Sequence, residues 1–175
     1  MNEIEKAMEE QQVINDRIKA ATAENEREFT KVLTFRVGEK VYGIEIDCVI
    51  EILGVPRVTA VPGTPYYLKG VTNVRSKIVP VVNIRSRFGV EEIEFDERTC
   101  TIIIEHNGVS VGVIVDEVLD VLPVQRKQQA DIPALEQVNI NRFIQYILEM
   151  PDGIKLVLDI QKLLFDSDFT QIIEE

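Results

Sequence analysis

The chain has 175 residues, of which 45% are hydrophobic and 28% are charged, with a formal net charge of −11. This composition is typical of a globular protein that is long enough to bury a core. The excess of acidic residues repels phosphate backbones and lipid headgroups, so it argues against nucleic-acid binding and membrane insertion and favours proteins as partners.

Residues 1–28 differ in kind from the rest of the chain. Their apolar and small residues recur at three- and four-residue spacing, which predicts an amphipathic helix. Because this stripe is narrow, we expect a solvated or partly frayed extension that folding does not require. Its polar start does not resemble a secretion signal, and no segment approaches the roughly 20 apolar residues of a membrane span, which predicts a cytoplasmic protein. The stripe consists of Ile4, Ala7, Gln11, Ile14, Ile18 and Ala21.

An internal repeat organises the rest of the chain. Residues 33–53 align with residues 102–122 at a constant offset of 69, and residues 67–88 align with residues 143–164 at an offset of 76. Two copies of one structural unit explain this pattern. The predicted organisation is an extension at 1–28, a domain at 29–166 with copies at about 29–89 and 98–164, and a tail at 167–175.

Each copy predicts a small all-β barrel. Two alternating runs, 33–37 and 41–46, flank a glycine turn and predict strand, turn and strand. Closure into a barrel removes exposed strand edges, so we expect two barrels that pack through a shared apolar layer. Asn83 and Asp159 hold equivalent positions and predict N-caps of short helices at the ends of the two copies.

No motif for catalysis is found in the sequence. It contains neither a glycine-rich phosphate loop nor a nucleophile elbow, and its single histidine, His106, lies beside a predicted Asn-Gly turn. Cys48 and Cys100 lie in apolar runs, which is typical of buried reduced thiols. Asp47 and Asp116 are equivalent in the two copies, but turn stabilisation is favoured over a pair of catalytic acids. We therefore expect a non-enzymatic protein without a metal or cofactor.

Arg75 stands out because the repeat does not require it. It lies where two apolar extended segments meet, next to Ser76, whereas the second copy has Pro151 and Asp152 at this corner. A solvated surface cation is one explanation. The other is a mixed apolar and charged groove between the copies, suited to a helical partner. The candidate lining residues of this groove are Val49, Glu51, Arg75, Val118 and Val121.

Three segments resemble the signature segments of the bacterial chemotaxis coupling protein family CheW. They are VYGIEIDCVIEILG, TPYYLKGVTNVRSKIVPVVNIRSRFG and VGVIVDEVLDVL, and the resemblance extends from about Phe29 to Leu164. It implies an all-β fold of two five-stranded, SH3-like β-barrels. It also implies a non-enzymatic adaptor that joins the cytoplasmic tip of methyl-accepting chemoreceptors to the histidine kinase CheA, at receptor arrays on the membrane, and lets receptors control autophosphorylation.

The resemblance further implies residues for each partner. The implied kinase-contacting residues are Val58 and Gly70. The family usually has Arg-Gly where this chain has Arg75 and Ser76. If this turn requires a positive φ, serine costs about 1 kcal/mol or more relative to glycine. The implied receptor-contacting residues are Val49, Glu51, Arg75, Ser76, Val118 and Val121.

Three alternatives to a chemotaxis adaptor were weighed. Small barrels often bind single-stranded nucleic acid, but that function needs a basic groove with stacking aromatics, whereas this chain is acidic and lacks tryptophan. An enzyme would need a catalytic constellation, and none is found. A scaffold in a chemosensory pathway with an output other than motility has the same sequence features, so it remains open beside chemotaxis.

Overall fold

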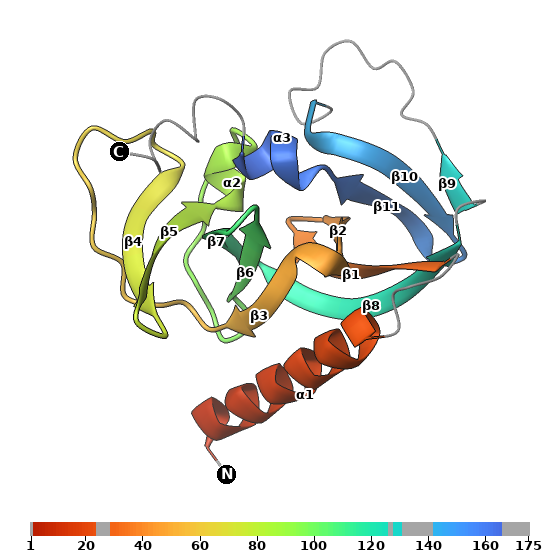
Figure 1. Cartoon of the computed structure of the whole chain (residues 1–175), viewed down its shortest axis with the longest axis horizontal. Coiled ribbons are helices and arrows are strands. Elements are labelled where there is room, and N and C mark those ends of the chain that lie inside the picture. Colours follow the sequence, from red (N-terminus) through yellow and green to blue (C-terminus); the bar gives the residue numbers. More distant parts are fainter. Residues whose placement is uncertain (1, 24–28, 126–127, 131–141, 166–175) are drawn as a thin grey trace.

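The computed structural model describes residues 2–23, 29–125, 128–130 and 142–165. These residues form two packed β-sheets, with a long N-terminal helix and two short helices (Figure 1). The predicted all-β fold class is therefore confirmed. The predicted tail at 167–175 lies outside the described residues.

The elements follow the order of the repeat. The first copy is preceded by α1 (Glu3–Ala23) and contains β1 (Phe29–Val37), β2 (Lys40–Glu45), the 3₁₀ turn η1 (Ile46–Cys48), β3 (Val49–Leu53), β4 (Leu68–Val74), β5 (Lys77–Asn83) and α2 (Ile84–Arg87). The second copy contains β6 (Cys100–His106), β7 (Val109–Val115), β8 (Glu117–Gln125), β9 (Gln129–Ala130), β10 (Ile144–Met150), β11 (Gly153–Leu158) and α3 (Ile160–Leu164). Sheet A has the strand order β8-β1-β2-β11-β10-β9, and sheet B has the order β3-β6-β7-β5-β4.

Each sheet contains strands from both sequence copies. The hairpin β1–β2 of the first copy joins sheet A, and its equivalent in the second copy, β6–β7, joins sheet B. The exchange is reciprocal, because Leu33 pairs with Val121 across β1 and β8, while the equivalent Ile102 pairs with Ile52 across β6 and β3. The prediction that each copy forms its own barrel is therefore wrong. Sequence alternation specifies the strands, but the equivalent edges of the two copies are alternative partners for the same hairpin.

Neither sheet matches the predicted closed, five-stranded barrel in full. Sheet A has six strands, because the short β9 pairs with β10 at its edge, and sheet B has five. In the described part of the chain, the two outer strands of each sheet do not pair with each other. The two outer strands of sheet B are covered in other ways: α1 packs on β3, and Thr59 pairs with Val71 of β4.

Two equivalent glycines lie in the central parallel strand pairs, and each makes room for a side chain of its antiparallel hairpin partner. β11 runs parallel to β2 at Gly43, and β5 runs parallel to β7 at Gly112. A Cβ atom at Gly43 would lie 2.5 Å from Cγ1 of Val32, and one at Gly112 would lie 3.0 Å from Cγ2 of Thr101, which is the repeat equivalent of Val32. Both copies of the repeat therefore have a glycine where a neighbouring strand approaches too closely for a side chain.

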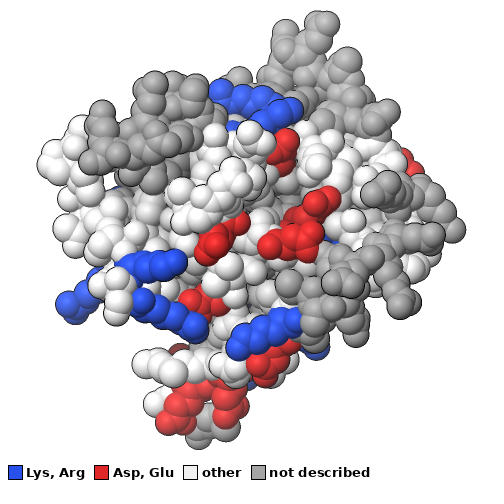
Figure 2. Space-filling view, in the orientation of Figure 1, with Lys and Arg blue, Asp and Glu red and all other residues white. Residues whose placement is uncertain are grey.

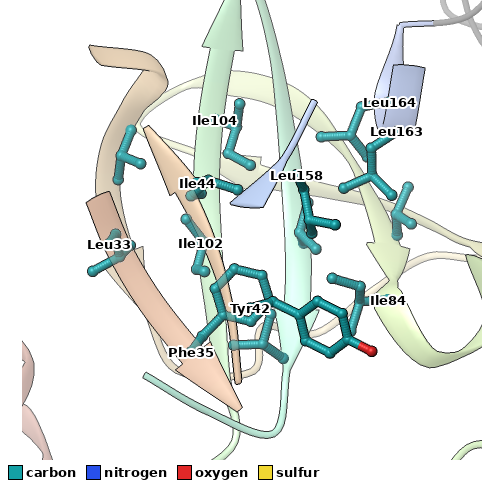
Figure 3. Close-up of a cluster of buried hydrophobic side chains, with 14 of the residues drawn as sticks. Leu33, Phe35, Tyr42, Ile44, Ile84, Ile102, Ile104, Leu158, Leu163 and Leu164 are labelled. Atoms are coloured by element: carbon teal, nitrogen blue, oxygen red, sulfur yellow. The ribbon is translucent and has the colours of Figure 1, made fainter. Parts of the chain in front are cut away.

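The main apolar core lies between the sheets and includes side chains from both short helices. Figure 3 shows these side chains converging from strands of both copies, so the two copies share one core. The labelled members are Leu33, Phe35, Tyr42, Ile44, Ile84, Ile102, Ile104, Leu158, Leu163 and Leu164. The prediction of a shared apolar layer is confirmed.

Both copies end in a capped short helix, as predicted. The Asn83 side chain accepts a hydrogen bond from the Arg85 N–H at 2.9 Å before α2, and the Asp159 side chain accepts one from the Lys162 N–H at 3.2 Å before α3. Each bond satisfies a backbone donor that the helix itself leaves unpaired. The caps therefore fix where β5 and β11 turn into helix.

Arg87 joins the two copies at the centre of the molecule. Its guanidinium carbon lies 4.4 Å from the ring centre of Tyr67 and 4.9 Å from that of Phe143, which are equivalent residues of the repeat. Its Nε donates a hydrogen bond to the Leu163 carbonyl at 2.7 Å. A buried arginine is tolerated here because two aromatic faces and a carbonyl replace the water that would otherwise solvate its guanidinium.

Contrary to expectation, α1 packs on the domain. Ile18 is only 2% exposed and belongs to the main core, and Ile14 packs against that core. The Asn15 side chain accepts a hydrogen bond from the Ile52 N–H at 2.7 Å and donates one to the Ile52 carbonyl at 3.2 Å. The expectation of a solvated or frayed extension is therefore wrong for Glu3–Ala23. These contacts also argue against the expectation that folding does not require residues 1–28.

Candidate partner-binding site

Arg75 and Ser76 form the two-residue turn of the β4–β5 hairpin, between the paired residues Val74 and Lys77. Their φ angles are 51° and 68°, so both central residues are left-handed, as in a type I′ turn. Residues with a Cβ adopt this region at a cost of roughly 1 kcal/mol each, and glycine or asparagine is usual here. The Ser76 N–H donates to the Asn73 side chain at 3.0 Å, which offsets part of that cost. The turn therefore has the positive φ under which serine was expected to be strained.

The equivalent hairpin, β10–β11, is built differently. Its corner residues are Pro151 and Asp152, and the proline ring fixes φ near −65°. Gly153 instead adopts a φ of 134°. The fold therefore accepts an unstrained residue pair at this corner, and it does not demand the strained pair found at Arg75 and Ser76.

Glu51 on β3 holds the Arg75 side chain. The Arg75 Nη2 atom donates to Glu51 Oε2 at 2.8 Å. The Arg75 side chain is 80% exposed, whereas that of Glu51 is 10% exposed. Exposed ion pairs contribute about 1 kcal/mol or less, so the effect of this contact is mainly orientation. A nearly buried carboxylate anchors one edge of a guanidinium that otherwise faces solvent.

The apolar residues predicted for the groove are largely buried. Val49 and Val118 lie in the main core, 5% and 8% exposed, and Val121 packs against it. Ile14 of α1 lines a pocket together with Val118. The predicted open groove between the copies is therefore corrected, because α1 packs on both β3 and β8.

The structure brings Val58 and Gly70 together. The Thr59 N–H donates to the Val71 carbonyl and the Val71 N–H donates to the Thr59 carbonyl, both at 2.9 Å. Gly70 has a φ of 144°, and a Cβ atom there would lie 2.7 Å from Cγ1 of Val58 and closer still to the Thr59 backbone. Gly70 thus has a packing reason of its own, because any side chain would push this segment away from β4.

One residue from each group of predicted contacts lies on or directly after β4, while the other receptor-group residues are on β3 and β8 and in the turn. Gly70 is in the middle of β4 and Arg75 follows its end, so about 16 Å separates them at the usual rise of a strand. Figure 2 shows basic side chains near the lower ends of β4 and β5, and acidic side chains on α1 below. The hairpin end is therefore locally basic on an acidic protein.

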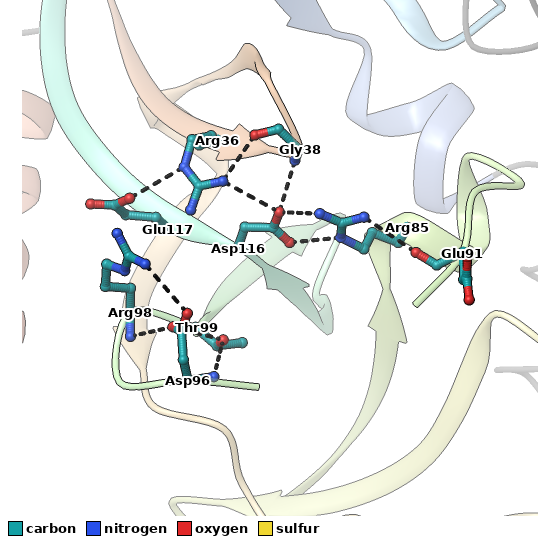
Figure 4. Close-up of polar contacts among 9 residues, drawn as sticks. All are labelled: Arg36, Gly38, Arg85, Glu91, Asp96, Arg98, Thr99, Asp116 and Glu117. Carbon is teal, nitrogen blue, oxygen red and sulfur yellow. Dashed lines mark hydrogen bonds and ion pairs between the residues drawn. The ribbon is translucent and has the colours of Figure 1, made fainter. Parts of the chain in front are cut away.

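Asp116 is the centre of a polar cluster that sequence analysis did not identify (Figure 4). Arg85 Nε donates to Asp116 Oδ1 at 2.9 Å, the Gly38 N–H donates to Oδ2 at 2.8 Å, and Arg36 lies 3.7 Å from Oδ2. Burial alone raises the pKa of Asp116, but these hydrogen bonds and charges outweigh it and hold the pKa below its ordinary value. The cluster ties the β1–β2 turn of sheet A to α2, which follows sheet B.

The repeat offered a signal for this cluster. Arg85 aligns with Gln161 at the offset of 76, so it is a cation that one copy has and the other lacks, as Arg75 is. Asp47, the equivalent of Asp116, lies exposed on η1. Asp116 itself fits the turn-stabilising role favoured from the sequence, because it accepts the Gly38 N–H in the β1–β2 turn.

The two cysteine thiols of the described residues have structural roles. Burial raises the pKa of the Cys48 thiol to about 12 and also raises that of Cys100, so both thiols are protonated near neutral pH. Within the described ranges, no group of three or more His, Cys, Asp or Glu side chains is placed to hold a metal ion. No helix in those ranges is long and apolar enough to cross a membrane.

The class that the fold defines is a duplicated domain of two β-sheets with exchanged hairpins. Residues 31–168 match the family model described as a CheW-like domain, and the chain belongs to this family. The family suggested by the three signature segments is thus confirmed.

Individual relatives agree with this assignment. The chemotaxis protein CheW of Klebsiella aerogenes is 32% identical over 140 residues, which are 80% of this chain and 84% of that protein. The chemotaxis protein CheW of Bacillus subtilis is 31% identical over 141 residues, which are 81% of this chain and 90% of that protein. The crystal structure of the scaffolding protein TtCheW from Thermoanaerobacter tengcongensis has a TM-score of 0.72 at 27% identity, and the match covers 79% of this chain and 94% of that one.

Proposed function

We propose that the chain is a non-enzymatic, cytoplasmic coupling adaptor of a chemotaxis pathway, recruited to receptor arrays at the membrane. It binds the tip of methyl-accepting chemoreceptors and the regulatory domain of the histidine kinase CheA, so that receptor state controls autophosphorylation. The family supports this class of function. The kinase-binding surface is centred on Val58 and Gly70. The receptor-binding face is formed by Val49, Glu51, Arg75, Ser76, Val118 and Val121.

The observation that carries the proposal is the turn at Arg75. The chain maintains two left-handed residues with side chains at a corner where the equivalent hairpin uses Pro151 and Asp152. Strain that the architecture does not demand is typical of functional sites. Because the planar guanidinium is already held by Glu51, it loses less freedom when it binds a carboxylate or backbone carbonyls of a receptor helix.

Coupling requires that both partners bind at once. Gly70 of the proposed kinase surface lies in β4, and Arg75 of the proposed receptor face follows the end of the same strand, so the two residues are separate points of one hairpin. An adaptor that links two binding events raises the effective concentration of one partner near the other. We therefore expect a saturating amount of kinase regulatory domain to leave a bound receptor fragment in place.

Arg75→Ala tests the receptor-binding face directly. We expect the variant to lose about 1 to 3 kcal/mol of receptor-fragment binding, because truncating an arginine anchor has this effect at interfaces. Its melting temperature and its affinity for the kinase domain should remain close to those of the parent. Lys40→Ala is a matched control, because Lys40 is an exposed cation at the β1–β2 turn. Unfolding of the Arg75→Ala variant, or a receptor affinity within twofold of the parent, would contradict the proposal.

A further inference from the structure

α1 is seated on the open edge of β3. Because β3 is the outer strand of sheet B, some of its backbone N–H and C=O groups point away from the sheet. Asn15 bonds to both outward groups of Ile52, accepting from the N–H at 2.7 Å and donating to the carbonyl at 3.2 Å. The Asn15 side-chain amide thus bonds the backbone groups of Ile52 that a further strand would otherwise pair with.

The same helix reaches the edge strand of sheet A. Arg17 pairs with Asp120 on β8 at 3.1 Å, and Ile18 enters the core cluster that contains Val49 and Val118. These two valines belong to the proposed receptor-binding face. α1 therefore packs on both β3 and β8, the strands that carry the proposed receptor-binding valines (Figure 1).

The hold on α1 is partial. Its N-terminal half leaves Ile4, the first residue of the stripe, 71% exposed, and the neighbouring Met8 64% exposed. The pocket between α1 and the domain has an excess of acidic side chains, because its charged lining residues are Glu3, Lys6, Glu10, Glu97, Arg98 and Glu117. Like charges around one pocket weaken the association of its walls. The Arg17 pair, with both side chains more than half exposed, adds little.

We infer that α1 is an intramolecular placeholder on the receptor-docking face and that a receptor helix binds by displacing it. This inference rests on the proposed function. The incoming helix presents an apolar residue where Ile18 packs and a polar side chain to the backbone of Ile52, while Arg75 grips it from the hairpin. The apparent affinity for the receptor is then the intrinsic affinity multiplied by the fraction of molecules in which α1 leaves the face free.

Two loosening variants and one control test the inference. Asn15→Ala removes both bonds to β3, and Arg17→Ala removes the pair with β8, while each retains Ile18 in the core. Lys19→Ala is the control, because Lys19 is exposed on the same helix. The assay titrates each full-length variant with a helical-hairpin fragment of a chemoreceptor tip. We expect Asn15→Ala to bind about fivefold more tightly or better, Arg17→Ala to change in the same direction by less, and the control to stay within twofold.

Hydrogen exchange distinguishes displacement from a shared interface. On addition of the receptor fragment to the parent chain, the amides of α1 should exchange faster while those of β6 and β7 stay protected. Slower exchange in α1, or weaker binding by Asn15→Ala, would show that α1 is part of the receptor interface and would overturn the inference alone. If neither the parent nor any variant binds the fragment, the proposed function fails and the inference with it.

Discussion

The Asp116 cluster gives a quantitative prediction, because one carboxylate holds two separate elements. The side chains of Asp116 and Arg85 are 7% and 15% exposed. Asp116→Asn keeps the shape of the side chain and removes its charge, so Arg85 retains a largely buried charge without its partner. Breaking a buried ion pair in this way costs about 3 to 5 kcal/mol, and the partial exposure of Arg85 reduces the expected loss to about 2 to 3 kcal/mol. For a chain of this length the melting temperature should fall by about 5 to 10 °C.

The pH dependence of this loss follows from the direction of the pKa shift. The pKa of Asp116 is lower in the folded state than its ordinary value near 3.9. Its contribution to stability is therefore complete above the unfolded pKa and is lost as the pH falls through the folded pKa. The difference in unfolding free energy between parent and variant should be constant from pH 7 to about pH 5 and should shrink below about pH 4.

Urea unfolding followed by circular dichroism measures both quantities. Glu94→Gln is the control, because Glu94 is an exposed carboxylate outside the cluster, and its loss should stay within about 0.5 kcal/mol. A loss below about 1 kcal/mol for Asp116→Asn at pH 7 would refute the reasoning. The reasoning would also be refuted if the difference in unfolding free energy between parent and variant did not shrink in acid. In that case the charge of Asp116 would not be what joins the β1–β2 turn to α2.

Two further predictions concern backbone positions. Ser76→Gly should raise the unfolding free energy by roughly 0.5 to 1 kcal/mol, because glycine adopts the φ of 68° without strain. A loss of stability in the same urea titration would show that serine fits this turn. Gly43→Ala should lower the unfolding free energy by about 1 to 3 kcal/mol, because the new Cβ would lie 2.5 Å from Val32. The control is Gly54→Ala, whose Cβ would meet Gln11 at an ordinary 3.6 Å. Equal melting temperatures for the two variants would contradict this prediction.

The features that could be predicted from the sequence are those that depend on local chemistry. The alternating strands and the caps at Asn83 and Asp159 follow from residue types and spacing, and both are present. Arg75 could be singled out because the second copy has a proline at its place, and the mismatch marks a residue that the shared architecture does not need. The six receptor-face residues stay a prediction, although Glu51 and Arg75 do meet.

The missed features depend on the choice between distant partners. Leu33 pairs with Val121 of the second copy, yet nothing in the alternation of its strand distinguishes that edge from the equivalent edge in its own copy. Asn15 is not a member of the apolar stripe, and its residue type gives no sign of a partner. Its amide instead matches two backbone groups of β3, and backbone groups of an edge strand leave no mark on the sequence of the helix that binds them.

The exchanged hairpins determine the order in which the sheets can be completed during synthesis. Sheet B has all its strands once Val115 has been made, whereas sheet A waits for β11, which ends at Leu158. β1 and β2 are the first strands to be made, but both of their neighbours in sheet A, β8 and β11, come from the second copy. At about 5 to 20 residues per second, the ribosome needs roughly 6 to 24 seconds to reach Leu158 after the end of β1. The nascent hairpin has two open edges until β8 is complete at Gln125 and one open edge until β11 is made, so this part of the newborn chain has the greatest need of a chaperone or of fast translation.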